Sequence, residues 1–188
     1  MAEMDGVWFA ASVSRGAVMG CAFSRDRDRA LSFLEGRLGG VAVSSRGDRG
    51  EGFARIAVEA MQRRMRGLDP VEDPPLDLSR LTGFKRRVLE IVSRIPRGYV
   101  STYRDVASLI GCVKGYRAVG AALKGNPFPL LIPCHRVVNS DLTIGGYTGL
   151  DGEGVWFKRR LLEVEGVKFR GRRVSAESLW RPGLEESR

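Results

Sequence analysis

The sequence has few histidines, cysteines and side-chain amides. Its 188 residues include one histidine, His135, and three cysteines, and asparagine and glutamine together number three. Cys21, Cys112 and Cys134 lack metal-ligand spacing, and one histidine adds little to them, so the sequence argues against a zinc site. The odd number of cysteines also argues against a complete disulfide framework. We therefore expect no metal.

Long hydrophobic runs are absent as well. No apolar stretch approaches the length of a membrane span, and no basic region followed by a long apolar one stands at the N-terminus. Hydrophobic residues still make up 43% of the chain, which is enough for a packed core. We expect a soluble, cytoplasmic protein of one large or two small domains that does not bind membranes.

Acidic residues are scarce only in the C-terminal part. Residues 1–79 carry 11 basic and 12 acidic side chains, a net charge of −1, whereas residues 80–188 carry 20 and 10, a net charge of +10; together they give +9. Such a basic domain indicates a polyanionic partner, because Lys and Arg neutralise phosphates and release counterions. A basic surface that only keeps the protein soluble is the alternative.

Arginine outnumbers lysine 26 to 5 in this chain. Together with the scarcity of Asn and Gln, this favours a source that grows at high temperature, although codon composition also enriches arginine. A purified protein that melts within the mesophile range of about 45–65 °C would contradict a thermophilic source.

The N-terminal part has the pattern of a small α+β domain without a catalytic constellation. Its expected elements are a hairpin over residues 5–24 with a turn at Ser14-Arg15-Gly16, a helix over 27–38, a short strand over 41–44 and a helix over about 51–66. Residues 68–77 hold three prolines and four acidic residues, which predicts a linker. We therefore divide the chain into residues 1–76, 77–170 and a basic tail, 171–188.

Beyond the linker, the spacing of apolar residues predicts three helices. Thr82 is expected to cap the first, Thr102 to cap a second that ends near Ile110, and the third to run from Tyr116 to Lys124. The last two are joined through a glycine turn, the pattern of a helix-turn-helix. The small residues of the third helix favour close, shape-based approach to DNA over reading of base edges.

The stretch over residues 126–138 contains three prolines and the residues best suited to chemistry. The prolines fix φ and remove backbone donors, so we predict a rigid, buried loop. Cys134 stands beside His135, and a neighbouring base favours the nucleophilic thiolate. Because adjacent side chains on extended backbone point to opposite sides, we expect a water molecule to carry the proton between them. An inert, buried cysteine is the alternative.

The sequence Pro-Cys-His-Arg-Val-Val, preceded by Gly-Asn-Pro, resembles the active-site signature of the O6-alkylguanine-DNA alkyltransferases. The resemblance extends from about Phe84 to Gly166. It implies an α+β protein with an RNase H-like N-terminal domain and a mostly helical C-terminal domain that carries a winged helix-turn-helix. It also implies a monomer without cofactors that binds double-stranded DNA, flips out O6-alkylguanine or O4-alkylthymine, and transfers the alkyl group irreversibly to Cys134 in a single turnover.

The same resemblance assigns roles to individual residues. Tyr103 would rotate the nucleotide out, Arg117 would fill the gap, and Glu165 would hold His135. The catalytic residues would be Cys134, His135, Glu165 and Asn126; the substrate pocket would include Tyr103, Tyr147 and Thr148; and Tyr103, Arg104, Arg117, Ala118, Gly120 and Ser140 would contact DNA. Tyr116 departs from the small residue that often precedes the arginine in relatives.

Two other classes of protein fit parts of these patterns. A DNA-binding regulator would use only the helix-turn-helix and prefer one sequence, and its Cys134 would serve packing. A cysteine hydrolase would use Cys134, His135 and Glu165 for acyl transfer and turn over repeatedly on an ester. A relative that binds damage without repairing it is a further alternative, but such relatives lack the cysteine.

Overall fold

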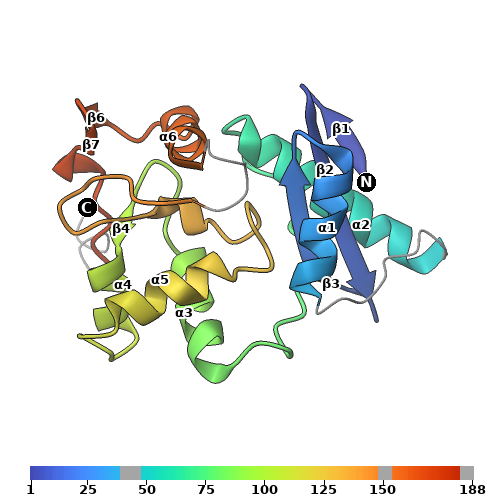
Figure 1. Ribbon diagram of the computed structural model, residues 1–188, viewed down its shortest axis with the longest axis horizontal. Helices are drawn as coiled ribbons and strands as arrows, with labels where there is room; N and C mark the ends of the chain where they lie inside the picture. Colours follow the sequence, from blue (N-terminus) through green and yellow to red (C-terminus); the bar gives the residue numbers. More distant parts are fainter. Residues whose placement is uncertain (39–47, 148–153, 183–188) are drawn as a thin grey trace. The chain divides into compact units, whose positions relative to one another are not determined.

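The computed structural model describes residues 1–38, 48–147 and 154–182. It combines helices with short strands and divides into two compact units (Figure 1). Among the described residues, the first unit comprises those within Met1–Leu81 and Gly125–Leu131, and the second comprises Thr82–Lys124, Ile132–Tyr147 and residues 154–182. The chain therefore leaves the second unit after helix α5 (Tyr116–Lys124) and returns to it just before Cys134.

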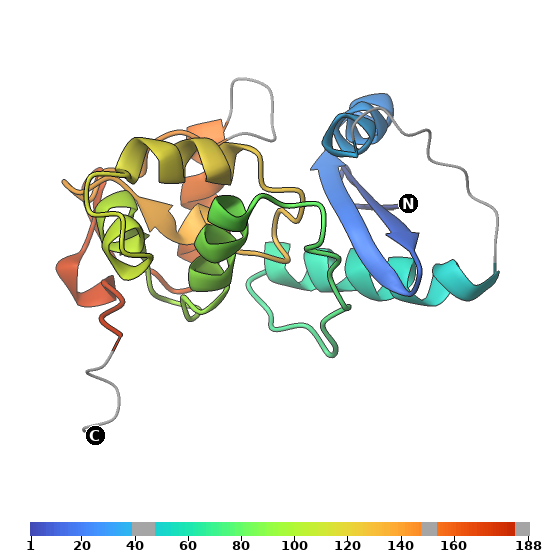
Figure 2. The ribbon, with the colours of Figure 1, turned by 90° about the horizontal axis from the view of Figure 1, so that it is seen from below.

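The first unit is built on an antiparallel sheet in the order β1-β2-β3, whose strands are labelled in Figure 1 and seen from below in Figure 2. The strands are Ala2–Met4, Val7–Ser14 and Ala17–Ser24. Both connections are two-residue turns with positive φ, 54° and 74° at Asp5-Gly6 and 52° and 79° at Arg15-Gly16. Such turns match the twist of paired strands. The predicted hairpin is thus confirmed, and β1 is an additional strand.

Two helices cover this sheet. They are α1 (Arg27–Arg37) and α2 (Asp48–Met65), and each packs against β2 and β3. Asp26 caps α1 by accepting a 2.8 Å hydrogen bond from the Arg29 backbone N–H. The buried side chains of Ala10, Ala22, Leu34 and Leu38 form a cluster between α1 and the hairpin. Both helices were predicted, whereas the strand predicted over 41–44 falls outside the described residues.

Two proline-rich segments bind the edge strand β3. Val18 donates a 2.8 Å hydrogen bond to the Pro75 carbonyl and accepts one of 2.8 Å from Asp77 N–H, while Cys21 N–H donates one of 2.8 Å to the Pro127 carbonyl. These bonds satisfy backbone groups that an edge strand otherwise leaves unpaired. The end of the stretch predicted as a linker is therefore docked on the sheet, as is the start of the segment that leads to Cys134.

The second unit is mostly helical. Its elements are α3 (Gly83–Ser93), β4 (Ser101–Thr102), α4 (Tyr103–Leu109), α5 (Tyr116–Lys124), a 3-10 turn (Cys134–Arg136), β5 (Val137–Val138), α6 (Gly154–Val164), β6 (Phe169–Arg170), β7 (Arg173–Val174) and a second 3-10 turn (Ala176–Ser178). Thr82 and Thr102 cap α3 and α4 as predicted, by accepting hydrogen bonds of 3.3 and 3.1 Å. Gly111, with φ at 75°, follows the end of α4.

Parallel pairing of β4 with β5 places the start of α4 beside the end of the cysteine motif. Ser101 lies opposite Val137, and Thr102 lies opposite Val138. A buried apolar cluster behind this pair includes Val100, Val138, Leu162, Val167 and Val174, and Leu179 of the tail packs against it. Residues 169–174 form a hairpin of β6 and β7, and the second 3-10 turn follows it in the tail.

Candidate active site and nucleic-acid interface

The backbone around Cys134 is held on both sides. Pro133 has φ −79° and ψ 62°, the geometry of an inverse γ-turn, and Cys134 N–H donates a 2.8 Å hydrogen bond to the Ile132 carbonyl. Arg136 N–H then donates one of 2.9 Å to the Pro133 carbonyl. The expected extended backbone is wrong here, because this proline turns the chain into a 3-10 helix. Successive side chains therefore project about 120° apart rather than to opposite sides.

His135 lies entirely inside the protein and contacts Glu165 from the end of α6. Its Nε2 is 2.9 Å from Glu165 Oε1, and the two side chains are 1% and 2% exposed. Cys134 on the same turn is 9% exposed. The structure thus brings together His135 and Glu165, which are 30 residues apart in sequence, directly after the cysteine.

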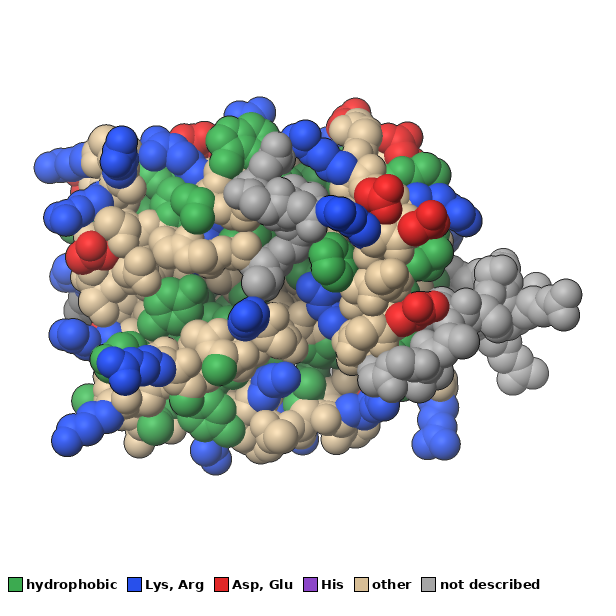
Figure 3. Space-filling view, in the orientation of Figure 1, with side chains coloured by type: hydrophobic (Ala, Val, Ile, Leu, Met, Phe, Trp, Pro, Cys, Tyr) green, Lys and Arg blue, Asp and Glu red, His purple; other side chains and the backbone are tan. Residues whose placement is uncertain are grey.

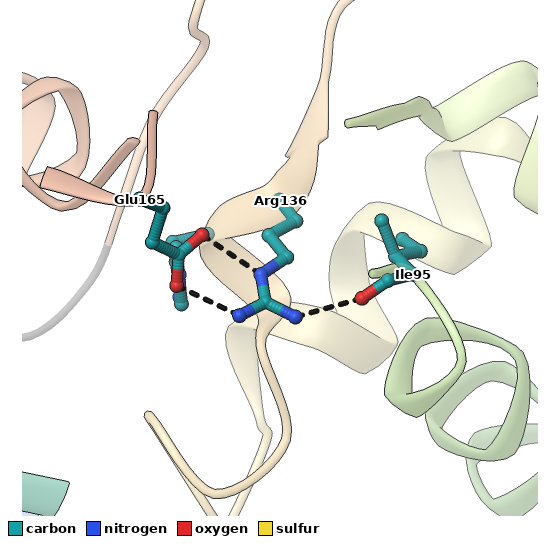
Figure 4. Close-up of polar contacts among 4 residues, drawn as sticks. Ile95, Arg136 and Glu165 are labelled. Carbon is teal, nitrogen blue, oxygen red and sulfur yellow. Dashed lines mark hydrogen bonds and ion pairs between the residues drawn. The ribbon is translucent and has the colours of Figure 1, made fainter. Parts of the chain in front are cut away.

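Arg136 completes this buried group and was not assigned a role from the sequence. Its Nε and one terminal nitrogen each donate a 2.8 Å hydrogen bond to Glu165, and its other terminal nitrogen donates one of 2.7 Å to the Ile95 carbonyl (Figure 4). A guanidinium forms such a two-bond contact with a carboxylate through its planar fork. The sequence signal that could have indicated this role is the position of Arg136 directly after Cys134 and His135 in Pro-Cys-His-Arg.

The charges of this group follow from its surroundings. Burial alone would raise the pKa of Glu165, but the contacts of His135 and Arg136 outweigh it and lower that pKa to about 2. Burial lowers the pKa of His135 below 6.5 despite the opposing effect of Glu165. At neutral pH Glu165 is therefore ionised against the permanent cation Arg136, and His135 is neutral.

This charge state determines the tautomer of His135. An ionised Glu165 only accepts hydrogen bonds, so the neutral imidazole donates from Nε2 and carries its lone pair on Nδ1. Nδ1 is buried and has no hydrogen-bond partner among the described residues. The ring is therefore poised to accept a proton at Nδ1.

A buried lysine, Lys158 of α6, also belongs to the site and was missed by sequence reasoning. Its Nζ donates a 2.6 Å hydrogen bond to the Val137 carbonyl and lies 5.7 Å from the centre of the Tyr103 ring. Burial lowers the pKa of Lys158 to about 8, and the charge of Cys134 opposes that shift. The available signal was helical spacing, because Lys158 shares the apolar face of Leu161 and Leu162.

Tyr103 opens α4 next to the same group. Burial raises its pKa, and the negative charge of Cys134 adds to the shift, so the phenol keeps its proton at neutral pH. The ring also lies against α5, since a Cβ at Gly120 would sit 3.9 Å from its Cε1 atom. Tyr103, Lys158 and the cysteine turn therefore come together from three separate segments.

Three further residues were expected at the site, namely Tyr147, Thr148 and Asn126. The Tyr147 ring lies 6.5 Å from His135 in an edge-on arrangement and is stacked at 6.2 Å on Phe157. Thr148 lies outside the described residues. Asn126 belongs to the first unit, where its Oδ1 accepts a 2.9 Å hydrogen bond from Phe128 N–H and its carbonyl accepts one of 3.2 Å from Arg37. Asn126 thus fixes its own loop, and its predicted catalytic role stays a prediction.

The residues expected to contact DNA are largely exposed. Arg104, Arg117, Ala118 and Ser140 are exposed, and Gly120 is half-buried. In Figure 3 the surface over the second unit shows many Lys and Arg side chains and few acidic ones, in keeping with the charge of residues 80–188. Such a surface suits a polyanion.

Two further properties concern the described ranges alone. Within residues 1–38, 48–147 and 154–182, no three His, Cys, Asp or Glu side chains gather as metal ligands. None of the helices described there is both long and apolar enough to cross a membrane.

Sequence comparison matches the second unit to known proteins. Residues 83–167 match the family model of the 6-O-methylguanine DNA methyltransferase DNA-binding domain. The methylated-DNA–protein-cysteine methyltransferase of Methanothermobacter thermautotrophicus is 51% identical over 96 residues, which is 51% of this chain and 51% of that protein. The chain therefore spans about half the length of the curated relatives it matches.

Structural comparison extends the similarity to most of the chain. The crystal structure of O6-methylguanine-DNA methyltransferase from the hyperthermophilic archaeon Pyrococcus kodakaraensis strain KOD1 is 33% identical, with a TM-score of 0.65 over 86% of this chain and 92% of that one. Mycobacterium tuberculosis OGT in complex with DNA is 37% identical, with a TM-score of 0.54 over 60% of this chain and 66% of that one. The expected mixture of helices and strands is confirmed, and the chain belongs to the O6-methylguanine-DNA methyltransferase family.

Proposed function

We propose that this protein repairs DNA by direct reversal, moving the alkyl group of O6-alkylguanine in double-stranded DNA onto Cys134. O4-alkylthymine presents a similar alkylated oxygen and would be a second substrate. The observation that carries the proposal is the buried group behind the cysteine. There Glu165, itself bound by Arg136, contacts Nε2 of a neutral His135 whose Nδ1 has no hydrogen-bond partner among the described residues. That arrangement activates a nucleophile and needs no metal or organic cofactor.

The first step is loss of the thiol proton. Nδ1 of His135 accepts it through one water molecule, which suits a turn that projects neighbouring side chains about 120° apart. Glu165 stabilises the imidazolium that forms, as the acid does in other nucleophile–histidine–carboxylate sites. The cation of Lys158, at the same site, adds positive charge near the resulting thiolate.

The second step is an in-line displacement. The Cys134 thiolate attacks the alkyl carbon, a sulfur–carbon bond forms, and the carbon–O6 bond breaks with its electron pair going to the guanine. Tyr147 and Thr148 would donate hydrogen bonds toward O6, where negative charge develops, and the released base takes up one proton. The thioether has no ready hydrolysis route, so each molecule acts once.

DNA binding completes the proposal. Helices α4 and α5 would act as a winged helix-turn-helix, with Tyr103 rotating the damaged nucleotide and Arg117 occupying the space it leaves. Arg104, Ala118, Gly120 and Ser140 would contact the backbone and groove. We further infer a monomer in the cytoplasm whose residues 1–76 form an RNase H-like domain, residues 77–170 the transferase domain and residues 171–188 a tail.

Intact-protein mass spectrometry tests this function. After incubation with an excess of duplex containing one O6-methylguanine, the mass of the protein should increase by that of one methyl group less the proton it replaces, and the methyl group should be located on Cys134. Cys134→Ala should gain none, while Cys112→Ala, which alters an exposed cysteine, should react like the wild type.

The same experiment separates the alternatives. Tight binding to the damaged duplex without a change of mass would overturn the repair function in favour of damage sensing, and preference for one undamaged sequence would favour a regulator. Repeated turnover of an ester would favour a cysteine hydrolase.

A further inference from the structure

The first two residues of α5 form a contact that the repair reaction as described does not use. Tyr116 is 44% exposed, and the guanidinium carbon of Arg117 lies 5.8 Å from the centre of the Tyr116 ring. A guanidinium at this distance is attracted by the negative face of an aromatic ring. The ring is therefore a support for the arginine at the surface rather than part of the core.

The rest of α5 offers Arg117 little other support. Ala118, Gly120 and Ala121 have no side chain long enough to hold a guanidinium. No acidic side chain in the described ranges forms an ion pair with Arg117. An arginine side chain without such a contact samples many rotamers. Fixing it in one rotamer when it enters the DNA costs conformational entropy.

We propose that Tyr116 is a positioning residue for Arg117, whose ring holds the guanidinium at the start of α5 before DNA binds. This inference rests on the proposed function, in which Arg117 occupies the space of the flipped nucleotide. The pre-positioned arginine loses less conformational freedom when it enters the base stack, so flipping on duplex DNA is faster. An arginine that only filled the space of the rotated nucleotide would need no aromatic neighbour.

A double-mutant cycle with single-turnover kinetics tests the inference. The measured quantity is the ratio of the alkyl-transfer rate on O6-methylguanine duplex to the rate on the free base O6-benzylguanine, which requires no flipping. Tyr116→Leu should lower this ratio by about two- to fivefold, the range for an exposed cation–aromatic contact. Tyr116→Phe keeps the aromatic ring and should therefore have the same ratio as the wild type. Tyr99→Leu alters another exposed tyrosine and should not change the ratio.

The cycle distinguishes an indirect effect from a direct one. If Tyr116 acts through Arg117, Tyr116→Leu has no further effect in the Arg117→Ala background. An equal loss in both backgrounds would show that Tyr116 contacts DNA itself and would overturn the inference, as would no loss in the wild-type background.

An independent measurement needs no repair chemistry. In NMR spectra of the free protein, the Tyr116 ring should shift the side-chain protons of Arg117 upfield in the wild type and Tyr116→Phe, but not in Tyr116→Leu. Absence of that shift in the wild type overturns the inference. Absence of alkyl transfer with the shift present instead counts against the proposed function.

Discussion

Two groups of charged residues in the second unit differ in their surroundings. Behind the cysteine, Arg136, Glu165 and Lys158 are buried, and each binds a defined partner at 2.6–2.9 Å. On α4 and α5, Arg104 and Arg117 are exposed to solvent. The buried charges are held in fixed positions, so they can set the protonation states of their neighbours. The exposed charges act at longer range and attract DNA of any base sequence.

In the proposed function, the two groups act at different stages. A buried charge without its partner is strongly destabilising, so the group behind Cys134 supports the folded structure as well as the proposed chemistry. Exposed charges contribute little to stability and remain available to bind phosphates. Mutations of the buried charges, and changes of pH that titrate them, should therefore affect mainly stability. Mutations of the exposed charges should affect mainly DNA binding.

The largest effect on stability is expected from Glu165→Gln. The change leaves Arg136 buried without a counter-charge, which should lower the free energy of unfolding by about 3–5 kcal/mol in a urea titration. Glu163→Gln is the matched control, because Glu163 lies on the same helix but pairs with Arg159 at the surface, and it should cost less than about 1 kcal/mol. Equal losses from the two variants would contradict the comparison.

Acid should destabilise the protein through the same buried group. The folded pKa of Glu165 lies near 2, below its ordinary 4.5, so its contribution is present above pH 4.5 and is lost as the pH falls toward 2. The expected loss is about 3 kcal/mol. His135, whose pKa is lowered, adds a loss that begins below pH 6.5. A urea titration series across this range measures it, and a flat profile in the wild type would contradict it.

Lys158 should make stability depend on pH in the same direction as Glu165, but in the alkaline range. Its folded pKa of about 8 lies below the ordinary 10.5, so the unfolded chain binds more protons between these values and stability rises with pH across them. The rise attributable to Lys158 is about 3 kcal/mol. The unfolding free energy of the wild type minus that of Lys158→Met should therefore increase from pH 8 to 10.5. A constant value of this difference would argue against a buried, charged Lys158.

The smallest effect on stability is expected at the exposed group. Arg104→Ala should change the free energy of unfolding by less than about 0.5 kcal/mol. It should nevertheless reduce the slope of log binding constant against log salt concentration by about 1 on undamaged duplex, because one phosphate contact is lost. Fluorescence anisotropy at several salt concentrations measures the slope, and an unchanged slope would remove Arg104 from the interface.

Local signals explain why much of the fold was predictable. Asp26, Thr82 and Thr102 mark helix starts through side-chain oxygens that accept backbone N–H groups, and this depends only on neighbouring residues. Strand β1 was missed because Ala2–Met4 is short and mixed in polarity, although Asp5-Gly6 is a strong signal for a tight hairpin turn.

The parts of the site that were missed depend on tertiary structure. The pairing of His135 with Glu165 followed from the family resemblance, whereas the contacts of Arg136 with Glu165 and Ile95 join segments that no local pattern connects. Lys158 was hidden because a charged residue in an amphipathic helix is ordinarily assigned to the solvent side. Its burial depends on acceptors supplied by Val137 and Gly146.

The path of the chain before Cys134 has a consequence for the order of folding. The stretch that precedes the cysteine turn docks on β3, where the Cys21 thiol donates to the Pro129 carbonyl across 108 residues of sequence. Closing a loop of that length is slow compared with forming helices, and Cys21 leaves the ribosome long before its partner is made. The reactive turn should therefore be among the last parts to mature, so that an incompletely folded chain would not carry an activated cysteine.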